Sequence, residues 1–218
     1  PPVGAHHHHV EHVGGKVPLE GGALGHVGDV TGGAAERAVE TGGTVHVMGL
    51  VSNIGVHSVL GHLYAVVELC KRAGVPGDRI VIHAFGDGRD SPPTSGLGYI
   101  REVEAKLHEI GAGRVASVCG RYWAMDRDKR WERTKAYYDA MVHGVGFETE
   151  PAASAEAALA AAYERGENDE FVKPTLIDGV DGTVRDDDVV IHFNFRADRA
   201  RQLTHALVDR EFDAFDRG

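Results

Sequence analysis

The chain has 218 residues with 33 acidic and 23 basic side chains, which give a formal net charge of −10 when histidine is neutral. A hydrophobic fraction of 42 % is too high for a disordered chain, and no apolar run reaches the ~20 residues that span a bilayer, so a membrane protein is not expected. The acidic balance argues against a general nucleic-acid binder, and two isolated cysteines, Cys70 and Cys119, favour a reducing cytoplasm over secretion.

Residues 1–43 show no sustained helical or alternating period, because pairs of glycines interrupt short apolar pieces. Four consecutive histidines at 6–9 project in different directions and fix no coordination geometry, so a tag-like segment is preferred over a metal site. We therefore expect residues 1–43 to be an irregular Gly/His-rich segment, and no function is assigned to them.

From residue 44 onward, nearly continuous apolar runs alternate with amphipathic stretches. In chain order we expect a strand over 44–51, a helix through 63–70, a strand over 79–85, a helix over 97–110, a strand over 114–119, helices through 138–141 and over 154–165, a strand over 188–195, and a last helix opening at 196–202. Buried strands that alternate with helices predict an α/β domain over 44–218, with a parallel or mostly parallel sheet and helices on both faces. The order of the strands stays open.

A polar loop follows each of the four expected strands, and three of these loops are rich in arginine. The carboxyl ends of parallel strands lie at one edge of a sheet, where such folds bind ligands. Side chains from loops far apart in the sequence are therefore expected to meet there. The candidate binding residues are His57, Arg89, Asp90, Arg121, Arg127, Arg196 and Arg199.

Five guanidinium groups in one pocket require a ligand with more than one negative charge, or they would repel each other without compensation. The planar fork of arginine matches carboxylate and phosphate oxygens in pairs, so a small ligand that carries both groups is indicated. Arg196 and Arg199 are three apart at a helix start and are expected to close on one anionic group. Asp90 is the candidate to handle a hydroxyl, as a hydrogen-bond acceptor or as a base.

Less specific interpretations remain open for the same residues. Arg127 lies between two aspartates and is equally a member of a solvated charge run, while Arg199 beside Asp198 is equally an ordinary helix-surface pair. His57 taken alone is more often a satisfied polar residue than a ligand contact. The histidines inside the expected strands are taken as structural: His46, His83 and His192.

Five motifs in order resemble the cofactor-independent (2,3-bisphosphoglycerate-independent) phosphoglycerate mutases. They are GVHS (55–58), DGRDSPP (87–93), GRYWAMDRDKRWER (120–133), DEFVKPT (169–175) and FNFRADRARQ (193–202). The resemblance runs from about residue 45 to about residue 204. By motif position, the seven candidate residues match the substrate-binding residues of that family.

The resemblance implies a two-domain enzyme that interconverts 3-phosphoglycerate and 2-phosphoglycerate in glycolysis and gluconeogenesis. A metal-binding domain related to alkaline phosphatase carries two manganese ions and a serine that becomes phosphorylated, and an inserted domain holds the glycerate. This chain is similar to the inserted, substrate-binding domain. In this role Asp90 would orient a glycerate hydroxyl or exchange a proton with it.

The sequence departs from the family pattern in two ways. Asn53, Ile54 and Val59 stand where the family typically has an Asp-Gly pair and a second histidine, and no serine lies in a Gly-Asn-Ser-Glu setting. We therefore expect the phosphatase-like domain, the nucleophile and the metal ligands to be absent from this chain, which would bind substrate, with no metal of its own, and not turn it over.

Two other functions remain as alternatives. A stand-alone, non-catalytic module that binds phosphoglycerates or related anions predicts binding without activity, even when the phosphatase-like domain is supplied as a partner. An arginine-rich nucleic-acid surface predicts a steep salt dependence on polynucleotides and no preference for phosphoglycerate. The family resemblance favours the mutase, with neither a nucleic acid nor a membrane as its partner.

Overall fold

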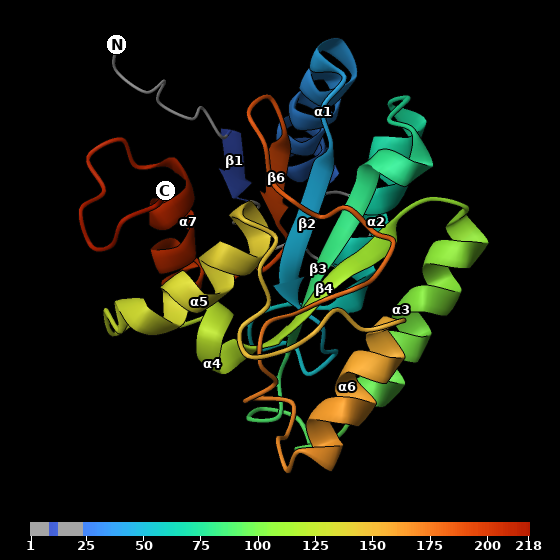
Figure 1. Cartoon of the computed structure of the whole chain (residues 1–218). Coiled ribbons are helices and arrows are strands. Elements are labelled where there is room, and N and C mark those ends of the chain that lie inside the picture. Colours follow the sequence, from blue (N-terminus) through green and yellow to red (C-terminus); the bar gives the residue numbers. More distant parts are fainter. Residues whose placement is uncertain (1–8, 13–23) are drawn as a thin grey trace.

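The computed structural model describes residues 9–12 and 24–218, and its strands form one six-stranded sheet in the order β1-β6-β2-β3-β4-β5 (Figure 1). Among the described strands, β5 alone runs antiparallel to its neighbour, and every other pair is parallel. The strands are β1 (His9–His12), β2 (Val45–Leu50), β3 (Ile80–Gly86), β4 (Arg114–Gly120), β5 (Thr175–Leu176) and β6 (Val189–His192). The predicted α/β fold with a mostly parallel sheet is confirmed.

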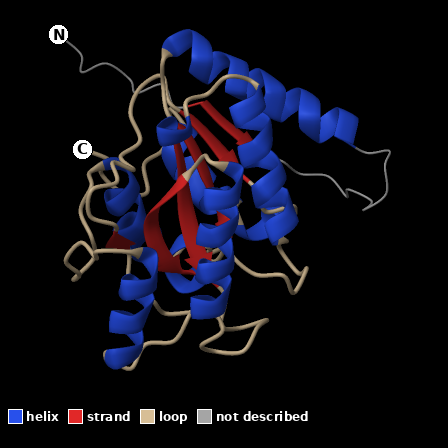
Figure 2. Cartoon of the chain, turned by 90° about the vertical axis from the view of Figure 1, so that its right-hand side faces the viewer, coloured by secondary structure: helices blue, strands red, loops and turns tan. Residues whose placement is uncertain are grey.

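Helices enclose the sheet on both faces (Figure 2). One hydrophobic cluster joins the strands to α1, α2, α3 and α6, and a second joins them to α4, α5 and α7. The helices are α1 (Leu24–Thr41), α2 (Leu60–Arg72), α3 (Gly96–Ile110), α4 (Arg121–Ala124), α5 (Trp131–Val142), α6 (Ala155–Glu164) and α7 (Arg201–Val208). Short 3₁₀ turns lie at Gly77–Arg79 and Ala197–Arg199.

The central strands are buried along their whole length. Every residue of β2, β3 and β6 is buried, which is the arrangement that a continuous apolar run predicts for a strand covered on both faces. Because these strands are parallel, the loops that follow β2, β3, β4 and β6 leave the sheet on the same side, where the carboxyl ends of the strands lie. We call this side the carboxyl edge and the opposite side, where the strands begin, the amino edge. The carboxyl edge carries the candidate residues.

The expectation of an irregular segment over residues 1–43 is wrong for residues 9–12 and 24–41. The first range is the edge strand β1, which pairs with β6, and the second is the helix α1. Ala34, Ala35 and Ala38 of α1 are buried in the core, so tertiary packing of small side chains stabilises a helix whose glycines hide its period. The tag-like interpretation of residues 6–8 falls outside the described residues.

The strand predicted over 188–195 is shorter than expected and ends at His192. Beyond it, the side-chain oxygen of Asn194 accepts the backbone N–H of Leu50 at 2.9 Å, and the backbone N–H of Phe195 donates to the carbonyl of His57 at 2.9 Å. The chain thus leaves the sheet to bond with the loop after β2. This brings the arginines that follow Phe195 toward His57.

Two of the histidines inside the strands belong to a buried chain of hydrogen bonds across the sheet. Asp188 Oδ2 lies 3.2 Å from His46 Nε2, His46 Nδ1 lies 3.0 Å from His83 Nε2, and His83 Nδ1 lies 2.8 Å from Ser117 Oγ. Ser117 Oγ in turn lies 3.0 Å from the hydroxyl of Tyr137 on α5. These hydrogen bonds link β2, β3 and β4 to α5, so His46 and His83 are structural, as predicted.

Candidate functional site: an arginine-lined cleft at the carboxyl edge

The guanidinium group of Arg121 lies at the centre of the site. Arg121 is the first residue of α4, and its Nη1 lies 2.6 Å from Asp87 Oδ1 and 2.6 Å from Asp90 Oδ2, while its Nη2 lies 3.0 Å from His57 Nε2. Three loops, after β2, β3 and β4, therefore converge on one buried side chain. The sequence identified three of these four residues and missed Asp87.

Asp87 fixes both Arg121 and the loop after β3. Its side chain is 1 % exposed, and its Oδ1 also accepts the backbone N–H groups of Arg89 at 3.3 Å and Asp90 at 3.0 Å. A buried carboxylate of this kind holds the loop in a turn and neutralises the guanidinium beside it. The loop residues Arg89 and Asp90 are thereby presented to the cleft in fixed positions.

His57 is neutral in this arrangement. Burial lowers the pKa of His57 to about 4, and the positive charges of Arg121 and Arg196 act in the same direction. A guanidinium group can only donate, so Nε2 of His57 accepts from Arg121 and the ring proton lies on Nδ1. Nδ1 faces Asp198 Oδ1 at 4.0 Å.

Asp198 lies between two of the predicted arginines. Its Oδ2 is 2.6 Å from Nη1 of Arg127 and 3.2 Å from Nη2 of Arg196, and its Oδ1 is 2.9 Å from Nε of Arg196. Burial raises the pKa of Asp198, but the hydrogen bond from Arg127 and the charge of Arg196 outweigh it and hold that pKa below its usual value. The loops after β4 and β6 are thus joined by one carboxylate.

The remaining predicted arginines, Arg89 and Arg199, lie beside this network. Nη1 of Arg199 donates to the carbonyl of Met125 at 3.1 Å, and burial lowers the pKa of Arg199 together with the charges of Arg121, Arg127 and Arg89. Nη1 of Arg89 lies 3.7 Å from Oε1 of Glu170. The structure therefore brings together all seven predicted residues, and their role in binding a ligand stays a prediction.

A cleft of about 320 Å³ opens on this network. Its lining holds four of the predicted arginines and two more that the sequence analysis did not single out, Arg130 and Arg133. The lining residues are Arg89, Arg121, Tyr122, Met125, Asp126, Arg127, Asp128, Arg130, Arg133, Glu170, Phe171 and Arg199. Arg133 stacks over the ring of Tyr122 with 3.8 Å between its guanidinium carbon and the ring centroid.

One expectation about charge needs correction. Carboxylates are interleaved with the five predicted arginines, so the guanidinium groups are not left to repel each other: Asp87, Asp90, Asp198 and Glu170 lie against them and leave one net positive charge. Within the chain, Arg196 pairs with Asp198, whereas Arg199 bonds to the carbonyl of Met125, and their closure on one anionic group of a ligand stays a prediction.

A segment at residues 168–172 forms the wall that carries Glu170. A Cβ atom on Gly86 would lie 2.5 Å from the carbonyl oxygen of Asp169, and one on Gly120 would collide with that of Glu170. The carboxylate of Asp169 accepts the backbone N–H of Gly96 at the start of α3 and a hydrogen bond from the hydroxyl of Tyr163. Glycines at the ends of β3 and β4 thus let this segment cross the sheet edge.

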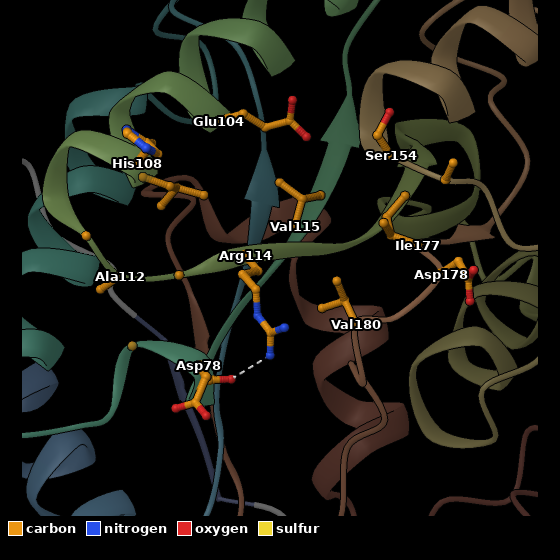
Figure 3. A pocket seen from close by; sticks show the side chains of 15 residues that line it. Asp78, Glu104, His108, Ala112, Arg114, Val115, Ser154, Ile177, Asp178 and Val180 are labelled. Carbon is orange, nitrogen blue, oxygen red and sulfur yellow. Dashed lines mark hydrogen bonds between the residues drawn. The ribbon is translucent and has the colours of Figure 1, made fainter.

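A larger hollow lies at the opposite, amino edge of the sheet, where Arg114 begins β4 (Figure 3). It has a volume of about 740 Å³, and Asp78, Glu104 and Asp178 contribute acidic side chains to its lining. Arg114 donates to the backbone carbonyl of Asp78 at 3.2 Å, and no second arginine lines the hollow within the described part of the chain. Arginine side chains therefore converge at the carboxyl edge and not in this hollow.

The described residues show neither a metal centre nor a membrane span. Within residues 9–12 and 24–218, no group of three histidine, cysteine or carboxylate side chains is arranged to hold a metal ion. No helix of that part of the chain combines the length and the apolar character that crossing a bilayer requires.

Comparison with known proteins supports the family resemblance that the motifs indicate. The family described as "BPG-independent PGAM N-terminus" matches residues 26–218. The 2,3-bisphosphoglycerate-independent phosphoglycerate mutase of Moorella thermoacetica is 55 % identical over 188 residues, which are 85 % of this chain and 36 % of that protein. The mutase of the same name from Natronomonas pharaonis is 53 % identical over 180 residues, which are 83 % of this chain and 35 % of that protein.

A solved structure agrees with these relatives. The phosphoglycerate mutase of Leishmania mexicana, crystallised at low cobalt concentration, superposes with a TM-score of 0.74 at 29 % sequence identity and covers 86 % of this chain and 39 % of its own. The chain spans about a third of the length of the curated relatives it matches.

Proposed function

This chain belongs to the family of 2,3-bisphosphoglycerate-independent phosphoglycerate mutases, whose N-terminal part it matches, and on this premise we propose that its arginine-lined cleft binds phosphoglycerate. The chain is then the substrate-binding part of an isomerase that interconverts 3-phosphoglycerate and 2-phosphoglycerate through a phosphoserine. The proposal extends to glycolysis and gluconeogenesis in the cytoplasm.

One observation carries the proposal: arginines from three separate loops line one cleft, and the guanidinium group of Arg121 among them is bonded to the neutral His57 and to the carboxylate of Asp90. Phosphoglycerate presents a phosphoryl group and a carboxylate three carbons apart, and each accepts pairs of hydrogen bonds from guanidinium forks. The guanidinium group of Arg121, already held by Asp87, loses little freedom on binding, so this part of the cleft is preorganised for such a ligand.

Asp90 is the residue that meets a glycerate hydroxyl in this proposal. Burial raises the pKa of Asp90, but the hydrogen bond and charge of Arg121 outweigh it and hold that pKa below its usual value. A general base works best with a pKa near the operating pH. The lowered pKa therefore favours Asp90 as a hydrogen-bond acceptor that orients the hydroxyl, over Asp90 as a base that removes its proton.

The phosphoryl acceptor of the proposed reaction lies outside this cleft. No serine, threonine or cysteine side chain is among the described residues that line it. Nor do the described carboxylates fit two manganese ions, since Asp87, Asp90 and Asp198 are each bonded to a guanidinium group. We propose that a phosphatase-like, metal-binding part of the enzyme supplies both the serine and the manganese, while this chain orients the glycerate.

Calorimetric titration at fixed ionic strength tests the binding proposal. We expect saturable 1:1 binding of 3-phosphoglycerate and of 2-phosphoglycerate. A single-stranded oligonucleotide, added at the same total concentration of phosphate groups, should bind more weakly at every salt concentration. Equal or tighter binding of the oligonucleotide, with a steep loss on added salt, would support a nucleic-acid surface instead.

The same chain can distinguish the mutase from a stand-alone binding module. It is mixed with a phosphatase-like domain of a relative and manganese, and the formation of 2-phosphoglycerate from 3-phosphoglycerate is measured. Activity that is lost in Arg121→Ala supports the mutase. Normal binding of phosphoglycerate with no activity in the mixture supports a module that binds these anions without catalysis.

A further inference from the structure

Asp198 occupies the position that an external anion would take. Its Oδ2 accepts hydrogen bonds from Nη1 of Arg127 at 2.6 Å and from Nη2 of Arg196 at 3.2 Å, and its Oδ1 lies 2.9 Å from Nε of Arg196, so one carboxylate is held between two guanidinium groups as a bound anion would be. Nδ1 of His57, the ring nitrogen that carries the proton, faces the same carboxylate at 4.0 Å. Two predicted binding arginines are thus already satisfied by a residue of the chain itself, whereas Nδ1 of His57 is buried without a hydrogen-bond partner among the described residues.

The contacts of Asp198 differ from those of Asp87 in how easily they can open. The side chains of Asp87 and Arg121 are 1 % and 3 % exposed, so separating them would leave charges in a water-poor interior. The side chains of Asp198, Arg127 and Arg196 are 29 %, 43 % and 48 % exposed. Water or a ligand can replace either partner there at small cost. Asp87 is therefore a permanent partner of its arginine, and Asp198 an exchangeable one.

We propose that Asp198, which is bonded to Arg127 of the cleft lining, is a specificity-determining residue, an internal carboxylate that competes with the ligand for Arg127 and Arg196. This inference rests on the proposed phosphoglycerate function and names what selects that ligand. Without ligand, Asp198 holds the two guanidinium groups. With ligand, a phosphoryl group takes its place, and the displaced carboxylate stays nearby as a negative charge.

The chemical consequence is discrimination by charge. A phosphoryl group carries nearly two negative charges and three acceptor oxygens, so it outcompetes a carboxylate for two arginines. An acid with only a carboxylate, such as glycerate, gains no more from these arginines than Asp198 already provides, so it does not displace Asp198 and finds both guanidinium groups occupied. Selectivity thus comes from an internal competitor that only the more highly charged ligand displaces.

The test is Asp198→Asn, which keeps the shape of the side chain and removes its charge. The affinity of 3-phosphoglycerate is measured by calorimetry, and that of D-glycerate by its competition with 3-phosphoglycerate, both at one ionic strength. We expect both affinities to rise and that of glycerate to rise more, so that the preference for 3-phosphoglycerate falls by about fivefold.

Asp181→Asn is the matched control, because Asp181 also pairs with an arginine, Arg185 at 2.7 Å, and its side chain is exposed. It removes the same charge from a pair outside the cleft lining, and both affinities should stay at their wild-type values. Weaker binding of 3-phosphoglycerate in Asp198→Asn, or an unchanged preference, would overturn the proposal. Absence of phosphoglycerate binding in the wild-type chain would instead overturn the proposed function.

A second measurement on the wild-type chain does not depend on the variant folding. In a structure of the chain with 3-phosphoglycerate, Asp198 should have separated from Arg127 or Arg196, with a phosphoryl oxygen at the vacated guanidinium nitrogen. Retention of the contacts to both arginines in the complex contradicts the proposal, because no competition then takes place.

Discussion

The two hollows at opposite edges of the sheet differ in what lines them. The amino-edge hollow is the larger, at about 740 Å³, and gathers acidic side chains around a single arginine. The carboxyl-edge cleft has about 320 Å³ and is lined by six arginines, four of them predicted from the loops after the strands. Volume alone would favour the amino edge, whereas the proposed ligand site lies at the carboxyl edge.

The difference follows from the topology of a parallel sheet. Loops that leave the carboxyl ends of β2, β3, β4 and β6 carry residues from four parts of the sequence to one place. The acidic lining of the amino edge repels anions, whereas interleaved carboxylates at the carboxyl edge hold arginines in place. What locates the proposed ligand site is the convergence of matched charges, and six substitutions test this comparison.

Arg121→Ala should have the largest effect on the carboxyl edge. It removes the group that Asp87, Asp90 and His57 share, and it leaves Asp87 as a buried charge without its partner. We expect the free energy of unfolding to fall by about 3–5 kcal/mol and phosphoglycerate binding to weaken by at least about 1.5–3 kcal/mol. Urea denaturation and calorimetric titration measure the two quantities.

Arg114→Ala is the matched change at the amino edge. Among the described contacts, the side chain of Arg114 makes one hydrogen bond, to the backbone carbonyl of Asp78 at 3.2 Å. We expect its loss to change neither quantity by more than about 0.5 kcal/mol. If Arg114→Ala weakened binding as much as Arg121→Ala, the choice of the carboxyl edge would be wrong.

Arg199→Ala separates binding from stability. Arg199 lines the cleft and bonds only to the carbonyl of Met125 among the described contacts, and its pKa is lowered by burial and by Arg121, Arg127 and Arg89. Removing a cation that its neighbours repel should cost little stability, while binding should weaken by about 1.5–3 kcal/mol. A variant that melts at the wild-type temperature and binds with unchanged affinity would exclude Arg199 from the site.

How far the sequence predicts this site depends on the range of the interactions involved. The strands at 44–51, 79–85 and 114–119 were predictable because burial on both faces leaves a local, continuous apolar run. The arginines were predictable because each follows a strand. Two of their carboxylate partners were not, since Asp87 meets Arg121 across 34 positions and Asp198 meets Arg127 across 71. Such pairs depend on tertiary structure.

The fold shows the same limit. The helix α1 escaped prediction because glycines interrupt its pattern, and the alanines that stabilise it do so only through contacts with the rest of the core. The two-residue strand β5 is too short for any period to be visible. Wherever long-range packing decides the conformation, a local pattern carries no signal of it.

His57→Gln tests the carboxyl edge through the pH dependence of folding stability. Burial lowers the pKa of His57 to about 4 in the folded chain, so between about pH 6.5 and pH 4 the unfolded state binds a proton that the folded state does not. Stability therefore falls as the pH falls through this window. In the variant we expect this decline to be smaller by up to about 3 kcal/mol, as measured by urea denaturation at several pH values. An equally steep decline would mean that His57 is not held neutral.

Glu104→Gln at the amino edge should have the smallest effect. Burial, and then the charge of Glu156, raises the pKa of Glu104, so its ionised form is disfavoured in the folded chain and its replacement should raise stability slightly at neutral pH. The free energy of binding 3-phosphoglycerate should change by less than about 0.3 kcal/mol, because the linings of the two hollows share no residue.

Glu170→Gln is the same substitution in the cleft, where removal of the carboxylate beside Arg89 should raise the affinity for 3-phosphoglycerate measurably. If calorimetry showed a larger change in affinity for Glu104→Gln than for Glu170→Gln, the larger hollow would have to be reconsidered as the ligand site, and charge convergence would no longer decide between the two edges.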